Sequence, residues 1–244
     1  MPHCSNRGDL NEKTGPCGWY GARVHTAVLF RYCVWGTKKL GRNEFPPLTI
    51  ESVDVFKVLG LCGAQRYDEL LQYLLAAVQN LAAAGAQFAA LSANTPHIVF
   101  DELQRRSPLP LVSIVQAACD EAKRRGYTKL GLLGTAFTMD GTFFTAPFTN
   151  SGITVVTPAA EEKQYISCKI ATELELWVVK PETRQQFLTI IDRMQRQQGI
   201  EAVVLGCTEL PLLFQGTSLP LACLDTMQIH INSLVRYILE EEAL

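Results

Sequence analysis

The chain has 244 residues, of which 48% are hydrophobic and 19% charged, a composition typical of globular proteins and not of disordered ones. Its net charge of -2 and isoelectric point near 6.1 exclude the strongly basic surface that nucleic-acid-binding proteins present. Its apolar runs are too short to cross a bilayer, and its first ten residues lack the apolar core of a signal peptide, so neither a membrane protein nor a secreted one is expected.

From residue 48 onward, short β-rich runs alternate with longer helical segments. The β-rich runs are continuously apolar, which is typical of parallel strands covered on both faces. The expected strands are Leu48–Val53, Gln87–Ser92, Leu109–Val115, Lys129–Leu133, Ile153–Val156, Ala202–Leu205 and Leu219–Leu224. Between them, Tyr67–Ala84 carries a leucine-rich stripe at helical spacing, and Pro181 begins a helix that runs to about Gln198. Alternating strands and helices predict an α/β fold of right-handed βαβ units.

Two stretches repeat one pattern of helix, glycine, buried strand and small polar turn. Gly85 stands eight positions before Ala93 in the first copy, and Gly199 stands eight before Cys207 in the second. Two facing copies of one unit would bring Ala93 and Cys207 to opposite walls of a single cleft. The repeat therefore indicates two similar halves with a site between them.

Cys207 lies where an expected strand ends and a helix is expected to begin. In open α/β sheets the ligand crevice lies beyond the carboxyl ends of the strands. A helix N-terminus favours a thiolate, so we expect the pKa of the Cys207 thiol to be lowered. The alternative is a buried structural cysteine. Against that alternative, Gly206 lets a ligand approach closely, and Thr208 offers a hydroxyl and an N–H to a carboxylate.

The same residues resemble a known family. Gly206-Cys207-Thr208-Glu209-Leu210 resembles the second signature of the aspartate/glutamate racemase superfamily, and Ala93-Asn94-Thr95-Pro96-His97 resembles its first. Further segments that resemble the family, within a likeness that runs from about residue 38 to the end, are Leu132–Thr135, Glu162–Lys163 and Asp225–His230.

The resemblance implies two pseudo-symmetric lobes, each a mainly parallel sheet flanked by helices. Residues 1–107, completed by 217–244, would form the first lobe, and 108–216 the second. The resemblance also implies racemisation of aspartate, glutamate or a related amino acid without pyridoxal phosphate or another cofactor. In that chemistry two thiols flank the substrate α-carbon, and one removes a proton while the other donates one to the opposite face.

The resemblance assigns the catalytic role to Cys207 and implies that Lys163 reaches a side-chain carboxylate, although Lys163 could instead be a solvated surface residue. The residues that would hold the substrate carboxylate are Asn94, Thr95, Thr135 and Thr208. For each of these three threonines, capping of a helix is an alternative or an additional role. His97 and His230 are expected to be packed helix residues, because no metal-ligand spacing surrounds either.

Ala93 occupies the position of the family's first catalytic cysteine, or threonine in some members, and has no proton to exchange. Ser92 is adjacent, but we expect its side chain to point to the other face of the strand. Two alternatives to a racemase therefore stay open. One is a single-cysteine decarboxylase or isomerase of the same superfamily, like arylmalonate decarboxylase, and the other is a catalytically inactive carboxylate-binding protein.

Residues 1–37 do not resemble the family, which opens with a strand and a loop like Gly-Gly-Met-Gly-Pro-Glu-Ser-Thr. When the reading frame of Gly18–Thr26 is shifted by one base, the degenerate codons permit that loop at all eight positions. We hypothesise that residues 14–36 or so are an out-of-frame translation, and the alternative is a divergent N-terminus.

The eight cysteines are irregularly spaced and include no Cys-x-x-Cys pair, which fits neither a disulfide framework nor a zinc site. This usage is typical of a reducing cytoplasm. We expect a cytoplasmic protein with a small-molecule amino-acid substrate, no metal, and neither a nucleic-acid nor a membrane partner. A homodimer is left open as the assembly.

Overall fold

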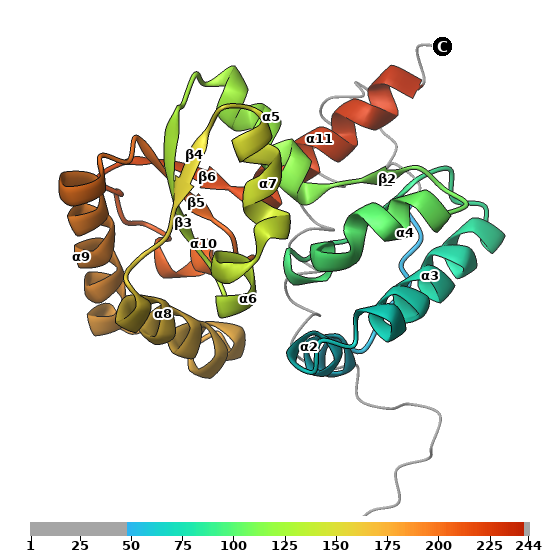
Figure 1. Cartoon of the computed structure of the whole chain (residues 1–244), viewed down its shortest axis with the longest axis horizontal. Coiled ribbons are helices and arrows are strands. Elements are labelled where there is room, and N and C mark those ends of the chain that lie inside the picture. The colour runs from blue at the N-terminus through green and yellow to red at the C-terminus, as the bar shows by residue number, and fades with distance from the viewer. Residues whose placement is uncertain (1–47, 242–244) are drawn as a thin grey trace, which may run out of the picture.

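The computed structural model of the chain describes residues 48–241, which form two lobes of parallel sheet and helix with helix α11 (Thr226–Glu241) running between them (Figure 1). The hypothesis of an out-of-frame segment concerns residues that lie outside this range. Within it, no helix is long and apolar enough to span a membrane. The predicted α/β class, with parallel sheets flanked by helices, is confirmed.

The second lobe is built on a four-stranded sheet in the order β4-β3-β5-β6, and every pairing in it is parallel. Its strands are β3 (Lys129–Leu133), β4 (Thr154–Val156), β5 (Ala202–Leu205) and β6 (Ala222–Asp225). The two central strands have the bounds that their apolar runs predict: β5 is buried along its whole length, and β3 along all but its first residue.

Helices flank this sheet on both sides (Figure 1). They are α5 (Ile114–Arg124), α6 (Ala136–Asp140), α7 (Thr142–Asn150), α8 (Ala160–Thr172), the short 3-10 helix η2 (Leu174–Leu176), α9 (Pro181–Gln198) and α10 (Leu210–Leu213). Their apolar sides bury a core that includes Phe144, Phe148 and Phe187, none of which is exposed. The carboxyl ends of β3 and β5 lie side by side in this sheet, and the residues that follow them lie near the first lobe.

The first lobe, as far as the structure describes it, has a two-stranded parallel sheet of β1 (Ala89–Ala90) and β2 (Leu111–Val112). Its helices are α2 (Val55–Gly63), α3 (Tyr67–Ala83), η1 (Thr95–Val99) and α4 (Phe100–Arg106). The stripe predicted on α3 is its buried face, because Leu70, Leu74 and Val78 pack in the core of this lobe.

Two expectations about strands are wrong. Leu48–Val53 forms no strand, because no described strand lies beside it to share hydrogen bonds, and Leu48 and Ile50 are about half exposed, at 49% and 54%. In addition, β2 pairs within the first sheet and β6 within the second, the reverse of the lobes to which the sequence boundaries assign these strands.

Helix α11 ties the lobes together. It packs against α5 of the second lobe, and its Tyr237 ring contacts Phe88 beside β1 with ring centroids 4.8 Å apart. His230 donates from Nε2 to the carbonyl oxygen of Val112 at 3.0 Å. The last helix therefore reaches the first lobe, and it fixes the strand ends of both lobes around a common space.

Candidate active site

A cavity of about 280 Å³ lies between the two lobes. Its walls include the segments that follow the carboxyl ends of three parallel strands: Leu91–Pro96 after β1, Thr135 after β3, and Gly206–Glu209 after β5. Helices α2 and α3 supply an aliphatic wall on the side of the first lobe. The cavity is thus at the edge of the sheets where α/β proteins bind ligands.

Five of the six residues singled out from the sequence come together here. The predicted residues that line the cavity are Asn94, Thr95, Thr135, Cys207 and Thr208. Lys163 is not among the lining residues, and its ammonium group forms an ion pair with Asp140 at the surface of the second lobe. Thr135 also caps α6, since its hydroxyl oxygen accepts from the N–H of Thr138 at 3.4 Å.

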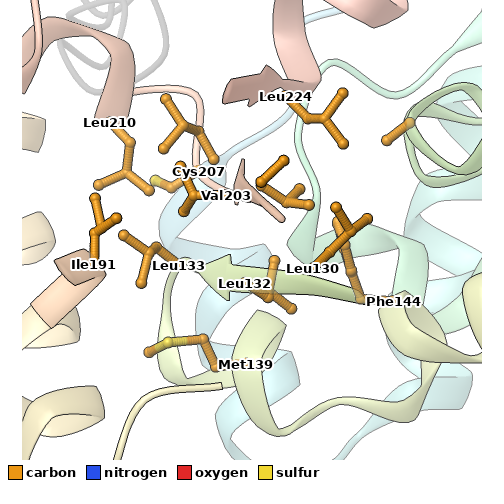
Figure 2. Close-up of a cluster of buried hydrophobic side chains, with 14 of the residues drawn as sticks. Leu130, Leu132, Leu133, Met139, Phe144, Ile191, Val203, Cys207, Leu210 and Leu224 are labelled. Carbon is orange, nitrogen blue, oxygen red and sulfur yellow. The ribbon is translucent and has the colours of Figure 1, made fainter. Parts of the chain in front are cut away.

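Cys207 lies at the edge of the second-lobe core, beside Val203 and Leu210, and is 7% exposed (Figure 2). Its thiol donates to Oε2 of Glu209 at 2.9 Å, and the Thr208 hydroxyl donates to the same oxygen at 2.9 Å. Glu209 is itself 9% exposed, so a buried carboxylate accepts both hydrogen bonds. The thiol and the carboxylate form one hydrogen-bonded pair on the cavity wall.

The expected lowering of the Cys207 pKa is wrong. Burial raises the pKa of this thiol well above its usual value, and the charge and hydrogen bond of Glu209 raise it further. The helix that follows, α10, is a single turn that begins three residues after Cys207, so its dipole does not offset these effects. The thiol therefore carries its proton in the unliganded protein.

Glu175, on η2, contributes a second carboxylate to the cavity. Burial raises the pKa of Glu175 to about 7, and the negative charge of Glu209 adds to the shift. A group with this pKa is partly protonated near neutral pH, so it can give or take a proton there.

The segment that carries Glu175 is anchored two residues earlier by Glu173, which is 3% exposed and is the buried member of an ion cluster. Glu173 accepts from the Thr183 hydroxyl at 2.6 Å and pairs with Lys169 at 2.6 Å and Lys180 at 3.2 Å. Burial alone would raise the pKa of Glu173, but these hydrogen bonds outweigh it and lower the pKa to about 2. The cluster joins the end of α8 to the start of α9 and fixes the base of the loop.

Asn94, which lines the cavity, has a buried side-chain amide. The Thr226 hydroxyl gives its one hydrogen to the carbonyl oxygen of Leu205 at 2.8 Å, so toward Asn94 it only accepts, and Nδ2 of Asn94 donates to it at 3.3 Å. This fixes the amide, and its Oδ1 has no hydrogen-bond partner among the described residues although Asn94 is 4% exposed. A buried acceptor without a partner is costly, so the site favours a ligand with an N–H donor here.

A family model described as Asp/Glu/Hydantoin racemase matches residues 26–234 of the chain. The chain belongs to the Asp/Glu/hydantoin racemase family. The match begins at residue 26 and so takes in part of segment 1–37, which we did not expect to resemble the family. The resemblance seen in the two signature motifs is confirmed.

Solved structures are similar to this family member over nearly their whole length. A crystal structure of a candidate Asp/Glu racemase from Yersinia pestis has 28% identity and a TM-score of 0.81, and the likeness covers 92% of this chain and 96% of that one. An aspartate racemase homologue from Pyrococcus horikoshii OT3 has 31% identity and a TM-score of 0.75, over 89% of this chain and 95% of that one. In a comparison of sequences, a glutamate racemase of Desulforudis audaxviator is 26% identical to this chain over 155 residues, which are 62% of this chain and 54% of that enzyme. The two-lobed architecture is therefore that of the family.

Ala93 lies in the segment that resembles the first signature. It lines the cavity beside Ser92 and Asn94. Behind it, His97 donates from Nδ1 to the carbonyl oxygen of Ala93 at 2.9 Å and accepts at Nε2 from the N–H of Ile114 at 3.3 Å. Burial and then the nearby His230 lower the pKa of His97 to about 3, so a neutral, packed histidine holds this segment, as predicted. Within residues 48–241, no group of three or more His, Cys, Asp or Glu side chains is placed to hold a metal.

Sequence reasoning missed the two carboxylates of this family member's site. Glu209 stands inside the second signature, and its signal was a charged residue beside the apolar Leu210–Leu213 run, where a solvated side chain is not expected. Glu175 lies far from the signatures in sequence, and only the fold of the loop before α9 brings it to the cavity. Its neighbouring leucines gave no sign of this role.

Proposed function

We propose that this chain is an amino-acid racemase that transfers the α-proton of aspartate, glutamate or a related amino acid through Cys207, without a cofactor. The observation that carries the proposal is the 2.9 Å hydrogen bond from the Cys207 thiol to the buried carboxylate of Glu209 on the cavity wall. Glu209 accepts the thiol proton, and the thiolate so formed removes the proton from the substrate α-carbon. Water then protonates the opposite face of the carbanion, which gives the enantiomer, and the hydroxide left behind takes the proton from Glu209. The family membership supports this reaction class.

The neighbouring polar groups suit the two ends of an amino acid. The substrate α-ammonium donates to Oδ1 of Asn94, the buried acceptor that has no partner in the described protein. Its positive charge next to the thiol also favours the thiolate, because an opposite charge at short range stabilises the ionised form. The α-carboxylate lies toward Thr95, Thr135 and Thr208. Thr208 gives its hydroxyl hydrogen to Glu209, so its backbone N–H is the donor that it offers.

A second candidate is a single-cysteine decarboxylase. Two observations favour it: Ala93 supplies no proton from the opposite wall, and the raised pKa of Cys207 keeps the thiol protonated at rest. A protonated thiol is suited to deliver one proton to a carbanion left by the loss of carbon dioxide. Such an enzyme needs only one proton donor.

Deuterium incorporation separates these functions. The full chain is incubated in D₂O with each of a panel of amino acids and substituted malonates, and the products are analysed by mass spectrometry and chiral chromatography. A racemase introduces deuterium at the α-carbon and yields the enantiomer, a decarboxylase releases carbon dioxide, and a binding protein does neither. Cys207→Ala should abolish either reaction, while Cys168→Ala, at an exposed cysteine on α8, should leave it unchanged. Full activity in the Cys207→Ala protein would contradict both candidates.

A further inference from the structure

We infer that the cavity takes an amino acid whose side chain carries no carboxylate, so that relatives of aspartate and glutamate with uncharged side chains are its ligands. The inference rests on the proposed function for the ligand being an amino acid, and it concerns which side chain that ligand has. It is carried by the charges of the cavity walls, by the contacts that hold Lys163 and Lys57 to other partners, and by the aliphatic surface of the first lobe.

The ionisable side chains on the described walls, apart from the Cys207 thiol, are all acidic: Glu51, Asp54, Glu175 and Glu209. Among the described lining residues there is no lysine, arginine or histidine to pair with a second carboxylate. Like charges disfavour each other: burial is the larger cause of the raised pKa of Glu175, and the negative charge of Glu209 raises it further. A substrate side-chain carboxylate would meet the same repulsion.

Two lysines that could serve as cations have partners of their own. Lys163, which the family resemblance assigned to a side-chain carboxylate, is paired with Asp140 outside the cavity. Lys57, on α2, places its ammonium group over the ring of Tyr73, 4.0 Å from the ring centroid. To neutralise a substrate carboxylate, either lysine would have to give up its present partner.

The remaining surface suits a neutral side chain. A substrate held between Asn94 and Cys207 leaves the first-lobe wall of the cavity for its side chain. That wall is formed by Val58, Leu74 and Val78, which belong to the core of the first lobe. Contact with these three side chains favours an apolar or uncharged substrate side chain, because they offer no hydrogen-bond donor to a carboxylate.

Binding to the full-length Cys207→Ala protein tests the inference without catalysis. Isothermal titration with L-asparagine and L-aspartate, and with L-glutamine and L-glutamate, compares side chains of nearly equal shape that differ in charge. We expect each amide to bind more tightly than its acid by roughly tenfold, the effect of one like charge at a distance of several ångströms in a partly buried site. Adding Glu175→Gln should shrink this ratio severalfold by improving the binding of the acids. Adding Glu182→Gln instead, at an exposed position at the start of α9, should leave the ratio unchanged.

Acids that bind as tightly as their amides, or more tightly, would overturn the inference, and so would a folded protein that binds none of the four. Failure of the proposed function gives a different result. In that case the native chain would exchange no α-proton in D₂O even though the amides bind more tightly than the acids. Conversely, rapid exchange with aspartate and none with asparagine would leave the proposed reaction standing and would contradict the inference about the side chain.

Discussion

Replacing Glu209 by glutamine tests whether its carboxylate is the acceptor of the Cys207 proton. Glutamine has the same shape and keeps an oxygen near the thiol, which is 2.9 Å from the carboxylate in the native chain, but it takes up no proton at neutral pH. General acid–base catalysis by one group typically contributes about 10²- to 10⁴-fold to a rate. We therefore expect the Glu209→Gln variant to exchange the substrate α-proton more slowly by about that factor, with the fold retained.

The same substitution should change the thiol in the opposite direction. After burial, which is the larger cause, the charge and hydrogen bond of Glu209 raise the pKa of Cys207. Removing a like charge that lies 2.9 Å from the sulfur removes two of these causes, so the pKa of Cys207 should fall. Without the carboxylate, the thiolate fraction at a given pH should rise.

Two assays read these effects: deuterium incorporation at the substrate α-carbon, and the rate at which iodoacetamide alkylates Cys207 as a function of pH. A lower pKa moves the midpoint of the alkylation curve to lower pH, whereas simple exposure of a loosened cysteine raises the rate at every pH. Glu182→Gln is the matched control and should alter neither assay. An exchange rate equal to that of the native chain, or an alkylation midpoint that does not fall, would refute the role of Glu209.

Four further predictions concern the cavity and its support. Cys207→Ser should abolish α-proton exchange with unchanged circular dichroism, because the serine hydroxyl is too weak an acid to form the base; retained activity would rule out Cys207 as the reacting group. Ala93→Cys should raise the rate of enantiomer formation, measured by chiral chromatography, because it supplies a proton donor on the opposite wall. Gly206→Ala should lower the free energy of unfolding by about 1–3 kcal/mol, since the added methyl lies 2.8 Å from a leucine side chain and 3.0 Å from a backbone oxygen. The control Gly60→Ala, on a helix and with no atom within 4 Å, should not. Because the pKa of Glu175 is raised from 4.5 to about 7, the native state holds a proton that the unfolded chain releases between these values, so stability falls as pH rises through this window. Glu175→Gln removes that fall, and urea unfolding at about pH 5 and pH 8 should show the variant gaining stability relative to the native chain as pH rises.

The parts of the fold that the sequence predicted best are those where burial is complete. Strands β3 and β5 lie in the middle of the second sheet, so the apolar run and the strand coincide. At the edge of the fold this relation fails. Leu48–Val53 is predicted as a strand from its apolar residues, but it is largely exposed and no described strand pairs with it. The sequence pattern does not reveal whether a neighbouring strand exists.

The same distinction applies to the candidate site. Motif position brought Cys207, Thr208 and Asn94 to one cavity, because the ends of parallel strands meet at one edge of a sheet. The protonation state of Cys207 could not be predicted from the sequence, because its pKa depends on burial and on the Glu209 carboxylate that accepts a hydrogen bond from the thiol. The position of Glu175 depends on the loop before α9, where Trp177 adopts a left-handed conformation with φ of 63° that no local pattern foretold.

The pseudo-symmetry of the two lobes does not extend to their acid–base groups. Cys207, Glu209 and Glu175 all come from the second lobe. The acids on the first-lobe wall are engaged in the structure of that lobe: Glu51 accepts from the side-chain amide of Asn80, and Asp54 caps α2. Ala93, which lines the same cavity, gives no proton. A base that removes the proton from one face of the α-carbon and returns a proton to the same face of the resulting carbanion exchanges the isotope without inverting the α-carbon. Inversion requires a proton delivered to the opposite face, and the donors for this step are water, a hydroxyl or the partly protonated Glu175, not a second thiol. For this chain, deuterium exchange should outpace formation of the enantiomer, and Ala93→Cys should bring the two rates together, because it restores the acid that the symmetry of the fold would otherwise provide.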